Sequence, residues 1–151
     1  MLARVTTTTE DPLALERQVC FALAVASRSV IALYRPVLEP MGLTHPQYLV
    51  MLALWERSPR TLRDLSSALQ LDPGTLSPLL KRLEAGDLIV RARDPQDERA
   101  LAVTLTPRGR RLRAKALEVP AQIVARLGLP VSDLEHMHAV LTRLIAAATE
   151  S

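Results

Sequence analysis

The sequence is poor in cysteine and in aromatic residues. Cys20 is the one cysteine among 151 residues, so no disulfide bond can form within the chain. Aromatic side chains make up 3% of the residues, while Ala, Leu and Val are abundant, which favours packed helices over a β-sandwich or a barrel. We find no unbroken apolar run of the roughly 20 residues that span a membrane, and the first ten residues lack the apolar segment of a secretory signal. The sequence therefore predicts a mainly helical cytoplasmic protein with no membrane partner.

The positive charge is concentrated in the middle of the chain. The net charge is +3 at neutral pH, yet residues 57–115 hold 13 Lys and Arg against 7 Asp and Glu, and the rest of the chain is acidic on balance. A concentrated basic segment indicates a polyanionic partner such as DNA. Charge alone is also compatible with a solvated, arginine-rich surface, so the motifs must decide between the two.

Hydrophobic periodicity predicts two helices in the first third of the chain. The first is expected to begin with Asp11 as N-cap before Pro12 and to run to about Leu38. The second is capped by Thr44 and is apolar nearly all round as far as Trp55. A helix without a polar face is a buried one, so we expect it to be the central core helix.

Two further helices are predicted in the last third. An arginine-rich helix opens at Thr106-Pro107, and Pro120 is expected to kink or divide it. A last helix starts at Pro130 and carries leucines on one face. The apolar faces of the terminal helices exceed what one small domain covers, which favours mutual burial in a two-fold dimer, although a monomer that packs its own ends is the alternative.

The middle segment predicts a helix-turn-helix followed by a hairpin. One short helix covers 61–69, and the next begins with Asp72 as N-cap before Pro73 and ends at Gly86, a suitable C′ residue. Two short helices joined by a tight turn are typical of a helix-turn-helix. The segments 88–93 and 100–105 then predict two strands joined by the polar loop 94–99, which together form a wing.

A recognition helix must present small, polar and basic side chains near its N-terminus to the major groove of DNA. The helix after Asp72 does so, and the wing adds arginines suited to phosphates and to the minor groove. Asp97 is placed to orient the Arg99 guanidinium, or is a plain turn residue. In the same way, Thr75 and Ser77 either contact DNA or only start the helix. The candidate DNA-binding residues are Thr75, Ser77, Pro78, Lys81, Arg82, Arg91, Arg93, Asp97 and Arg99.

The motif Asp97-x-Arg99 followed by Leu105-Thr106, just after a helix-turn-helix, resembles the wing of the MarR family of winged-helix regulators. The order of segments matches that family over nearly the whole chain. The resemblance implies a mainly α fold with a small β-wing and a single domain over 1–151. In it, about 11–56 and 107–150 form interlocking dimerisation helices, and about 57–106 form the DNA-binding lobe. It further implies a homodimeric transcriptional repressor, not an enzyme, bound to a pseudo-palindromic operator in double-stranded DNA with half-sites roughly 34–36 Å apart.

The residues around Cys20 are similar to those of the organic-hydroperoxide-sensing, single-cysteine branch of the MarR family. The segments that carry this likeness are 18–23, 33–36, 46–51 and 55–56. In that branch the N-terminal cysteine reacts with the peroxide, and two tyrosines hydrogen-bond it. Tyr34 matches one tyrosine, and His45 occupies the position of the other. The resemblance thus implies a redox-sensing set of Cys20, Tyr34 and His45.

The chemistry of such a site is coherent. The thiolate, not the thiol, attacks a peroxide, and hydrogen bonds to the anion favour it. Tyr34 can donate one such bond; His45 can donate another and, if protonated, would add a positive charge. Oxidation yields a sulfenic acid, which a low-molecular-weight thiol, a second copy of Cys20 or a backbone nitrogen can condense with. The resemblance favours the low-molecular-weight thiol, with release of the operator as the outcome.

Other readings of these residues stay open. Cys20 is otherwise a small hydrophobe on an apolar helix face. One alternative hypothesis is a regulator gated by a lipophilic or phenolic ligand. Two further alternatives are a thiol peroxidase and an architectural DNA-binding protein that responds to no signal. We expect no metal and no cofactor, because His136 and His138 face different sides of a helix and do not pair with Cys20 and His45 as ligands.

Overall fold

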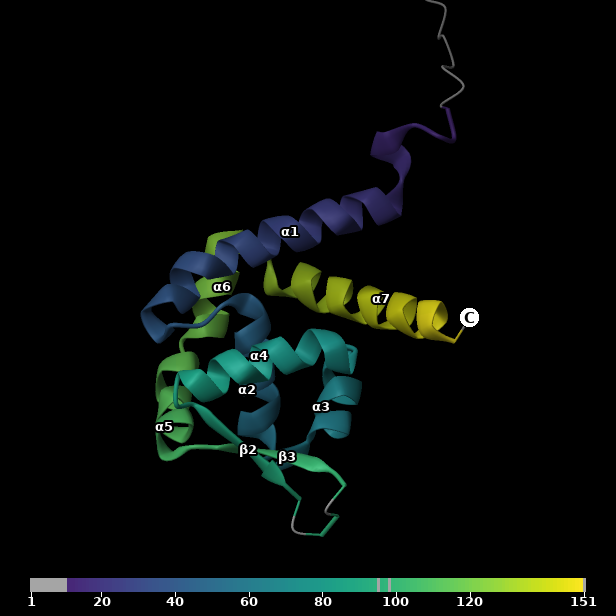
Figure 1. The fold of residues 1–151 in the computed structure, drawn as a ribbon. Coiled ribbons are helices and arrows are strands. Elements are labelled where there is room, and N and C mark those ends of the chain that lie inside the picture. The colour runs from purple at the N-terminus through teal and green to yellow at the C-terminus, as the bar shows by residue number, and fades with distance from the viewer. Residues whose placement is uncertain (1–10, 95, 98, 151) are drawn as a thin grey trace, which may run out of the picture. The chain divides into compact units, whose positions relative to one another are not determined.

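The computed structural model describes residues 11–94, 96–97 and 99–150 (Figure 1). The chain divides into two compact units, Met1–Leu33 and Tyr34–Ser151, and helix α1 contains the boundary between them. The fold is mainly helical with a small antiparallel sheet, which confirms the predicted fold class. The elements are η1 Leu15–Arg17, α1 Val19–Leu38, η2 Glu39–Met41, α2 His45–Glu56, β1 Arg60–Thr61, α3 Leu62–Leu69, α4 Pro73–Ala85, β2 Ile89–Arg93, β3 Leu101–Leu105, α5 Pro107–Ala116, α6 Val119–Leu127 and α7 Val131–Thr149.

The first unit begins with a turn where the sequence predicts a helix N-cap. The Asp11 carboxylate accepts the backbone N–H of Leu13, and the Gln18 side chain donates to the carbonyl of Pro12. These local side-chain bonds compete with helix formation. Helix α1 therefore starts only at Val19, after the 3₁₀ turn η1, and the prediction of Asp11 as its N-cap was wrong.

The second unit is built around α2, as predicted. Thr44 and Gln47 form a capping box at its start, and most of its residues are buried. Helices α3 and α4 pack on α2, and leucines of α4 complete the core (Figure 1). The buried leucines of α4 are Leu76, Leu79, Leu80 and Leu83.

Helix α4 starts where the sequence predicts, but its C′ position is one residue later than predicted, at Asp87 instead of Gly86. Asp72 accepts the backbone N–H of Thr75 as N-cap. At the other end Gly86 has φ −82°, and it is Asp87, with φ 59°, that adopts the left-handed conformation. The backbone N–H of Leu88 then bonds the carbonyl of Leu83, and that of Asp87 bonds Glu84, which is the Schellman pattern with an aspartate at C′.

The sheet has strand order β1-β3-β2, and both pairings are antiparallel. The hairpin β2–β3 matches the predicted wing. The two-residue strand β1, which pairs Arg60 with Val103, was not predicted because such a short segment has no recognisable period.

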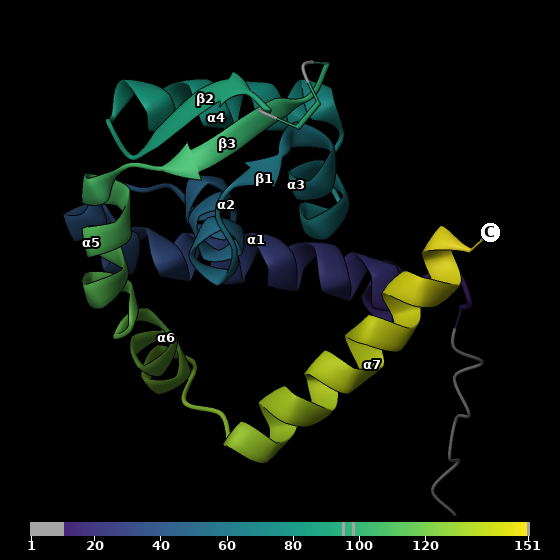
Figure 2. The same cartoon turned by 90° about the horizontal axis from the view of Figure 1, so that it is seen from below.

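Helix α5 is fixed to the base of the hairpin. The Thr106 hydroxyl donates to the carbonyl of Asp87, and the Trp55 indole N–H donates to the carbonyl of Gly109 at 2.9 Å. Gly109 allows close approach, because a Cβ there would lie 2.1 Å from the carbonyl oxygen of Leu88. The helix predicted after Pro107 is divided just before Pro120, into α5 and α6 (Figure 2).

The long helices carry apolar side chains that the chain itself does not cover. None of the described residues of α7 is buried, and Met137, Val140, Leu144 and Ile145 are 37–49% exposed. In α1 only Val37 and Leu38 are buried. The stretch Val19–Met41 is, by length and composition alone, long and apolar enough to cross a membrane, which corrects the expectation that no such stretch exists. Core helices of soluble proteins satisfy the same criterion.

Candidate functional site

The candidate recognition residues share the solvent face of α4. The buried leucines define one side of the helix, and Gly74, Pro78 and Lys81, at i, i+4 and i+7, lie opposite to it. Thr75, Ser77 and Arg82 flank this row, and all of these residues are exposed. Helix α4 continues through Pro78. The face that the sequence predicts to read DNA is therefore open along its whole length.

Thr75 also takes part in the cap of α4. Its backbone N–H and its hydroxyl donate to the two carboxylate oxygens of Asp72, at 2.8 and 3.0 Å. These bonds, led by the backbone one, hold the pKa of Asp72 below its ordinary value. The Thr75 hydroxyl oxygen can still accept a bond, but its proton already has a partner.

The wing tip presents two exposed arginines, Arg93 and Arg99. Asp97 acts on the backbone, because its carboxylate accepts the Arg99 backbone N–H at 3.1 Å. This is the turn role that the sequence left open as the alternative to orienting the Arg99 guanidinium.

Arg91 is held within the protein instead of projecting freely from the wing. Its guanidinium and its backbone N–H donate to the two carboxylate oxygens of Glu84, at 3.1 and 2.9 Å. The backbone bond is the first cause of a pKa of Glu84 below its ordinary value. Because Glu84 belongs to α4 and Arg91 to β2, this pair ties the recognition helix to the wing.

The start of α3 adds residues that the sequence analysis missed. A hollow of about 520 Å³ is lined by Thr61, Leu62 and Arg63 of this region and by Asp97 and Arg99 of the wing. Arg63 is exposed, so the hollow has cationic side chains on both sides. The signal in the sequence was Arg63 as a polar residue on an amphipathic helix, but only the fold brings it next to the wing.

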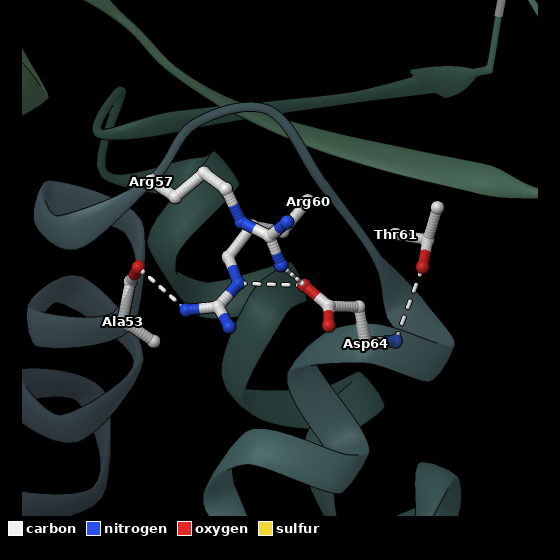
Figure 3. A network of polar contacts seen from close by, with 5 residues as sticks. All are labelled: Ala53, Arg57, Arg60, Thr61 and Asp64. Carbon is white, nitrogen blue, oxygen red and sulfur yellow. Dashed lines mark hydrogen bonds and ion pairs between the residues drawn. The ribbon is translucent and has the colours of Figure 1, made fainter.

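An ion-pair network fixes α3 against the end of α2 (Figure 3). Arg57 and Arg60 both contact one carboxylate oxygen of Asp64 at 2.7 Å, and Arg60 also donates to the carbonyl of Ala53 at 2.9 Å. The Arg60 side chain is 9% exposed. The hydrogen bond from Arg60 is the main cause of a pKa of Asp64 below its ordinary value of 3.8.

Cys20 lies in the first turn of α1 and is exposed as a free thiol. Within the single chain it therefore lies outside the core.

Tyr34 and His45 lie side by side in the second unit, together with Tyr48. The Tyr34 and His45 rings are 4.8 Å apart edge to face, and the Tyr34 and Tyr48 rings are 5.9 Å apart. Burial raises the pKa of both tyrosines and lowers the pKa of His45 from its ordinary value of 6.5. Burial therefore favours the neutral form of His45, which has one N–H to offer as a donor.

Next to this cluster is a small apolar cavity. It has a volume of about 250 Å³ and is lined by Tyr48, Leu52 and Trp55 of α2 and by Ala116, Leu117 and Pro120 of α5, α6 and the turn between them. Glu56 and Arg113 also line it. His136 and His138 of α7 are exposed, and within the described part of the chain no three His, Cys, Asp or Glu side chains are placed to hold a metal ion.

Comparisons with known proteins agree with this arrangement. A family model described as the transcriptional regulator SarA/Rot matches residues 32–115. The chain is 38% identical over 135 residues to the organic hydroperoxide resistance transcriptional regulator of Bacillus subtilis, which covers 89% of this chain and 92% of that protein.

Solved structures show the same fold. Reduced AbfR bound to DNA, a Staphylococcus epidermidis protein, is 33% identical with a TM-score of 0.75 over 89% of this chain and 94% of its own. AbfR has also been solved overoxidised on DNA and with a disulfide formed. BpsR of Bordetella bronchiseptica is 28% identical, with a TM-score of 0.80 over 89% of this chain and 97% of its own. The DNA binding of BpsR is regulated by 6-hydroxynicotinic acid.

Proposed function

The chain belongs to the SarA/Rot and MarR type of winged-helix transcriptional regulators, and on that basis we propose that it is a cytoplasmic, homodimeric repressor that releases DNA when an organic hydroperoxide oxidises Cys20. The observation that carries this proposal is the exposed, free Cys20 in the first turn of α1, in a chain 38% identical to an organic hydroperoxide resistance regulator. The reduced form of the similar protein AbfR bound to DNA, together with its disulfide form, supports a redox response.

The proposed reaction has two steps. The Cys20 thiolate attacks the outer oxygen of the hydroperoxide, the O–O bond breaks, and the leaving alkoxide takes a proton to become an alcohol, which leaves Cys20 as a sulfenic acid. A low-molecular-weight thiol then attacks the sulfenic sulfur, forms a mixed disulfide and releases water. The sulfur is oxidised in the first step and the peroxide is reduced. A second thiol restores Cys20 by exchange.

Tyr34 and His45 are the proposed donors that stabilise the thiolate within the dimer. Their rings lie 4.8 Å apart edge to face, so both donors belong to one cluster. Burial lowers the pKa of His45, which favours the neutral imidazole as the donor at neutral pH. We therefore expect His45 to act as the family's tyrosine does, by hydrogen bonding instead of by charge.

DNA is the proposed partner of the exposed face of α4 and of the wing tip. Gly74, Pro78 and Lys81 form the centre of that face, and small and apolar groups there admit close approach to bases and to thymine methyl groups. Arg93 and Arg99 are the wing contacts, and Arg63 adds a contact at the start of α3. Arg91 supports the wing from within through Glu84.

A homodimer is proposed because the long helices leave apolar side chains uncovered. Phe21, Val25 and Ile31 of α1 are 38–40% exposed, and α7 has four large apolar side chains in a similar state. Exposed apolar side chains in this number on a helix mark protein–protein contact, and a second copy of the chain is the proposed partner of each helix.

The first test measures DNA binding by fluorescence anisotropy, with a duplex selected from a random pool, before and after treatment with cumene hydroperoxide and a small thiol. Wild type is expected to bind with a steep salt dependence and to lose binding on oxidation, whereas Cys20→Ser stays bound. The matched control is Cys20→Ser/Ser29→Cys, which has a thiol elsewhere on the exposed surface of α1 and is expected to stay bound as well. Equal release of wild type and Cys20→Ser contradicts the sensing mechanism.

The apolar cavity beside Tyr48 supports a second candidate function, gating by a small ligand. A volume of about 250 Å³ with mainly apolar lining, one arginine and one glutamate suits a single aromatic ring with polar substituents. Trp55 lines the cavity and is the one tryptophan of the chain, so its fluorescence reports occupancy. Quenching by a hydroxylated aromatic acid, with DNA release that survives in Cys20→Ser, supports this candidate; an unchanged fluorescence signal excludes it.

A further inference from the structure

Helix α5 carries a row of cations that neither the wing nor the redox site uses. Its sequence holds Arg108, Arg110, Arg111, Arg113 and Lys115 and no acidic residue. All five side chains are exposed. Among the described residues, the carboxylates found in ion pairs are those of Asp64 and Glu84, and their partners are arginines outside α5. These ion pairs therefore neutralise none of the five cations of α5.

These cations fall into two groups around the helix. Gly109 and Ala116 are buried and face the core. Arg108, Arg111 and Lys115, at i, i+3 and i+7, share one flank, and Arg110 and Arg113 share the other. Arg110 and Arg113 line a hollow with Trp55 and Glu56 of α2, whereas Arg108 and Arg111 line none of the described hollows. We call Arg108, Arg111 and Lys115 the outer row.

The outer row is costly to the helix that carries it. Arg108 lies in the first turn, where the helix dipole disfavours a cation, and like charges at i, i+3 and i, i+4 repel each other. Such a concentration of one charge on an exposed face is explained by an anionic partner. A buried dimer contact does not explain it, because the cores of protein interfaces are depleted of charge.

The outer row is held rigidly to the DNA-binding elements. Thr106, the N-cap of α5, bonds the carbonyl of Asp87 through its hydroxyl and that of Leu88 through its backbone N–H at 3.1 Å. Those two residues directly follow the end of α4. The row starts two residues beyond this attachment and spans about 10 Å, the length of duplex axis over which one strand carries roughly three phosphates.

We propose that the outer row binds the phosphate backbone of duplex DNA just outside the operator half-site. This inference rests on the proposed function, because the recognition helix must first place the dimer on DNA. The row then adds sequence-independent contacts and lengthens the stretch of DNA that the protein covers.

The test compares two duplexes and two variants of the full-length dimer. One duplex ends at the outer edges of the two half-sites, and the other is extended by about one helical turn of unrelated sequence at each end. Arg108→Gln/Arg111→Gln removes two charges of the outer row, and Arg110→Gln/Arg113→Gln removes two charges of the same type from the opposite flank.

Wild type is expected to bind the extended duplex roughly tenfold more tightly than the trimmed one at about 0.1 M salt. Arg108→Gln/Arg111→Gln removes four charges from the dimer, so it is expected to lose that gain and to lower the salt slope on the extended duplex by about 4, with unchanged binding to the trimmed duplex. Arg110→Gln/Arg113→Gln keeps the gain.

Three results overturn the proposal. Equal wild-type affinity for both duplexes shows that the row faces another partner, such as an acidic protein, while the proposed function stands. Equal loss in the two double variants shows a general effect of charge. Absence of binding to the trimmed duplex removes the proposed function and this inference together.

Discussion

Replacement of Gly109 by alanine tests the attachment of α5 to the base of the wing. A Cβ at this position would lie 2.1 Å from the carbonyl oxygen of Leu88, and that neighbour is backbone that cannot rotate away. The helix must then withdraw by about 1 Å to reach van der Waals distance. The bonds that close the attachment, from Trp55 to Gly109 at 2.9 Å and from Thr106 to Leu88 at 3.1 Å, would stretch beyond hydrogen-bonding range.

The expected loss follows from these contacts. Three hydrogen bonds, including that from Thr106 to Asp87, contribute roughly 0.5–1.5 kcal/mol each, so the free energy of unfolding should fall by about 3 kcal/mol. For a chain of this length the melting temperature should drop by roughly 6–12 °C. Urea unfolding at a fixed subunit concentration, followed by Trp55 fluorescence, measures the change.

Gly86→Ala is the matched control for this prediction. Its Cβ would meet its nearest neighbours at 3.6 Å, and its φ of −82° suits any residue. We expect its stability to equal that of wild type or to exceed it by about 0.5 kcal/mol. A Gly109→Ala protein within about 0.5 kcal/mol of wild type would refute the close approach on which the reasoning depends.

Three further predictions concern ion pairs and the aromatic cluster. Asp64→Asn leaves Arg60 without its charged partner and should lower the free energy of unfolding by about 1–2 kcal/mol at pH 7. The folded-state pKa of Asp64 lies below its unfolded value of 3.8, so the stability difference between wild type and Asp64→Asn, measured by urea titration, should disappear as the pH falls below that value. Glu84→Ala should accelerate hydrogen exchange at the Arg91 amide, and the Val103 amide is the internal reference that should not change. Equal protection of the Arg91 amide in wild type and Glu84→Ala contradicts the Glu84–Arg91 hydrogen bond. His45→Phe should slow the reaction of Cys20 with hydroperoxide about tenfold, whereas His45→Tyr should keep the wild-type rate, as measured by thiol consumption. A wild-type rate in His45→Phe would show that His45 is not part of the redox site.

The helices and the wing were predictable because their signals are local. Three helix starts are each fixed by capping residues within a few positions, and no tertiary contact overrides them. These are Thr44 with Gln47, Asp72 before Pro73, and Thr106 before Pro107. Asp11 carries the same signal before Pro12, but there the carboxylate and Gln18 form a turn with neighbouring backbone groups.

The details of the candidate site were less predictable because they depend on tertiary contacts. The carboxylate of Glu84 meets Arg91 only once β2 folds back along α4, so an arginine expected on DNA is found in an ion pair. Arg63 joins the wing residues for the same reason. The Tyr34–His45 contact joins residues from two helices, and its geometry follows from packing instead of spacing.

The most direct test of the central claim follows the mass of the intact protein and its DNA occupancy in the same sample during hydroperoxide treatment. We predict that DNA is released in step with the gain of one oxygen, and then of one small thiol, per subunit at Cys20, and that a reducing thiol reverses both changes. Release of DNA from protein whose Cys20 is still unmodified would contradict the account.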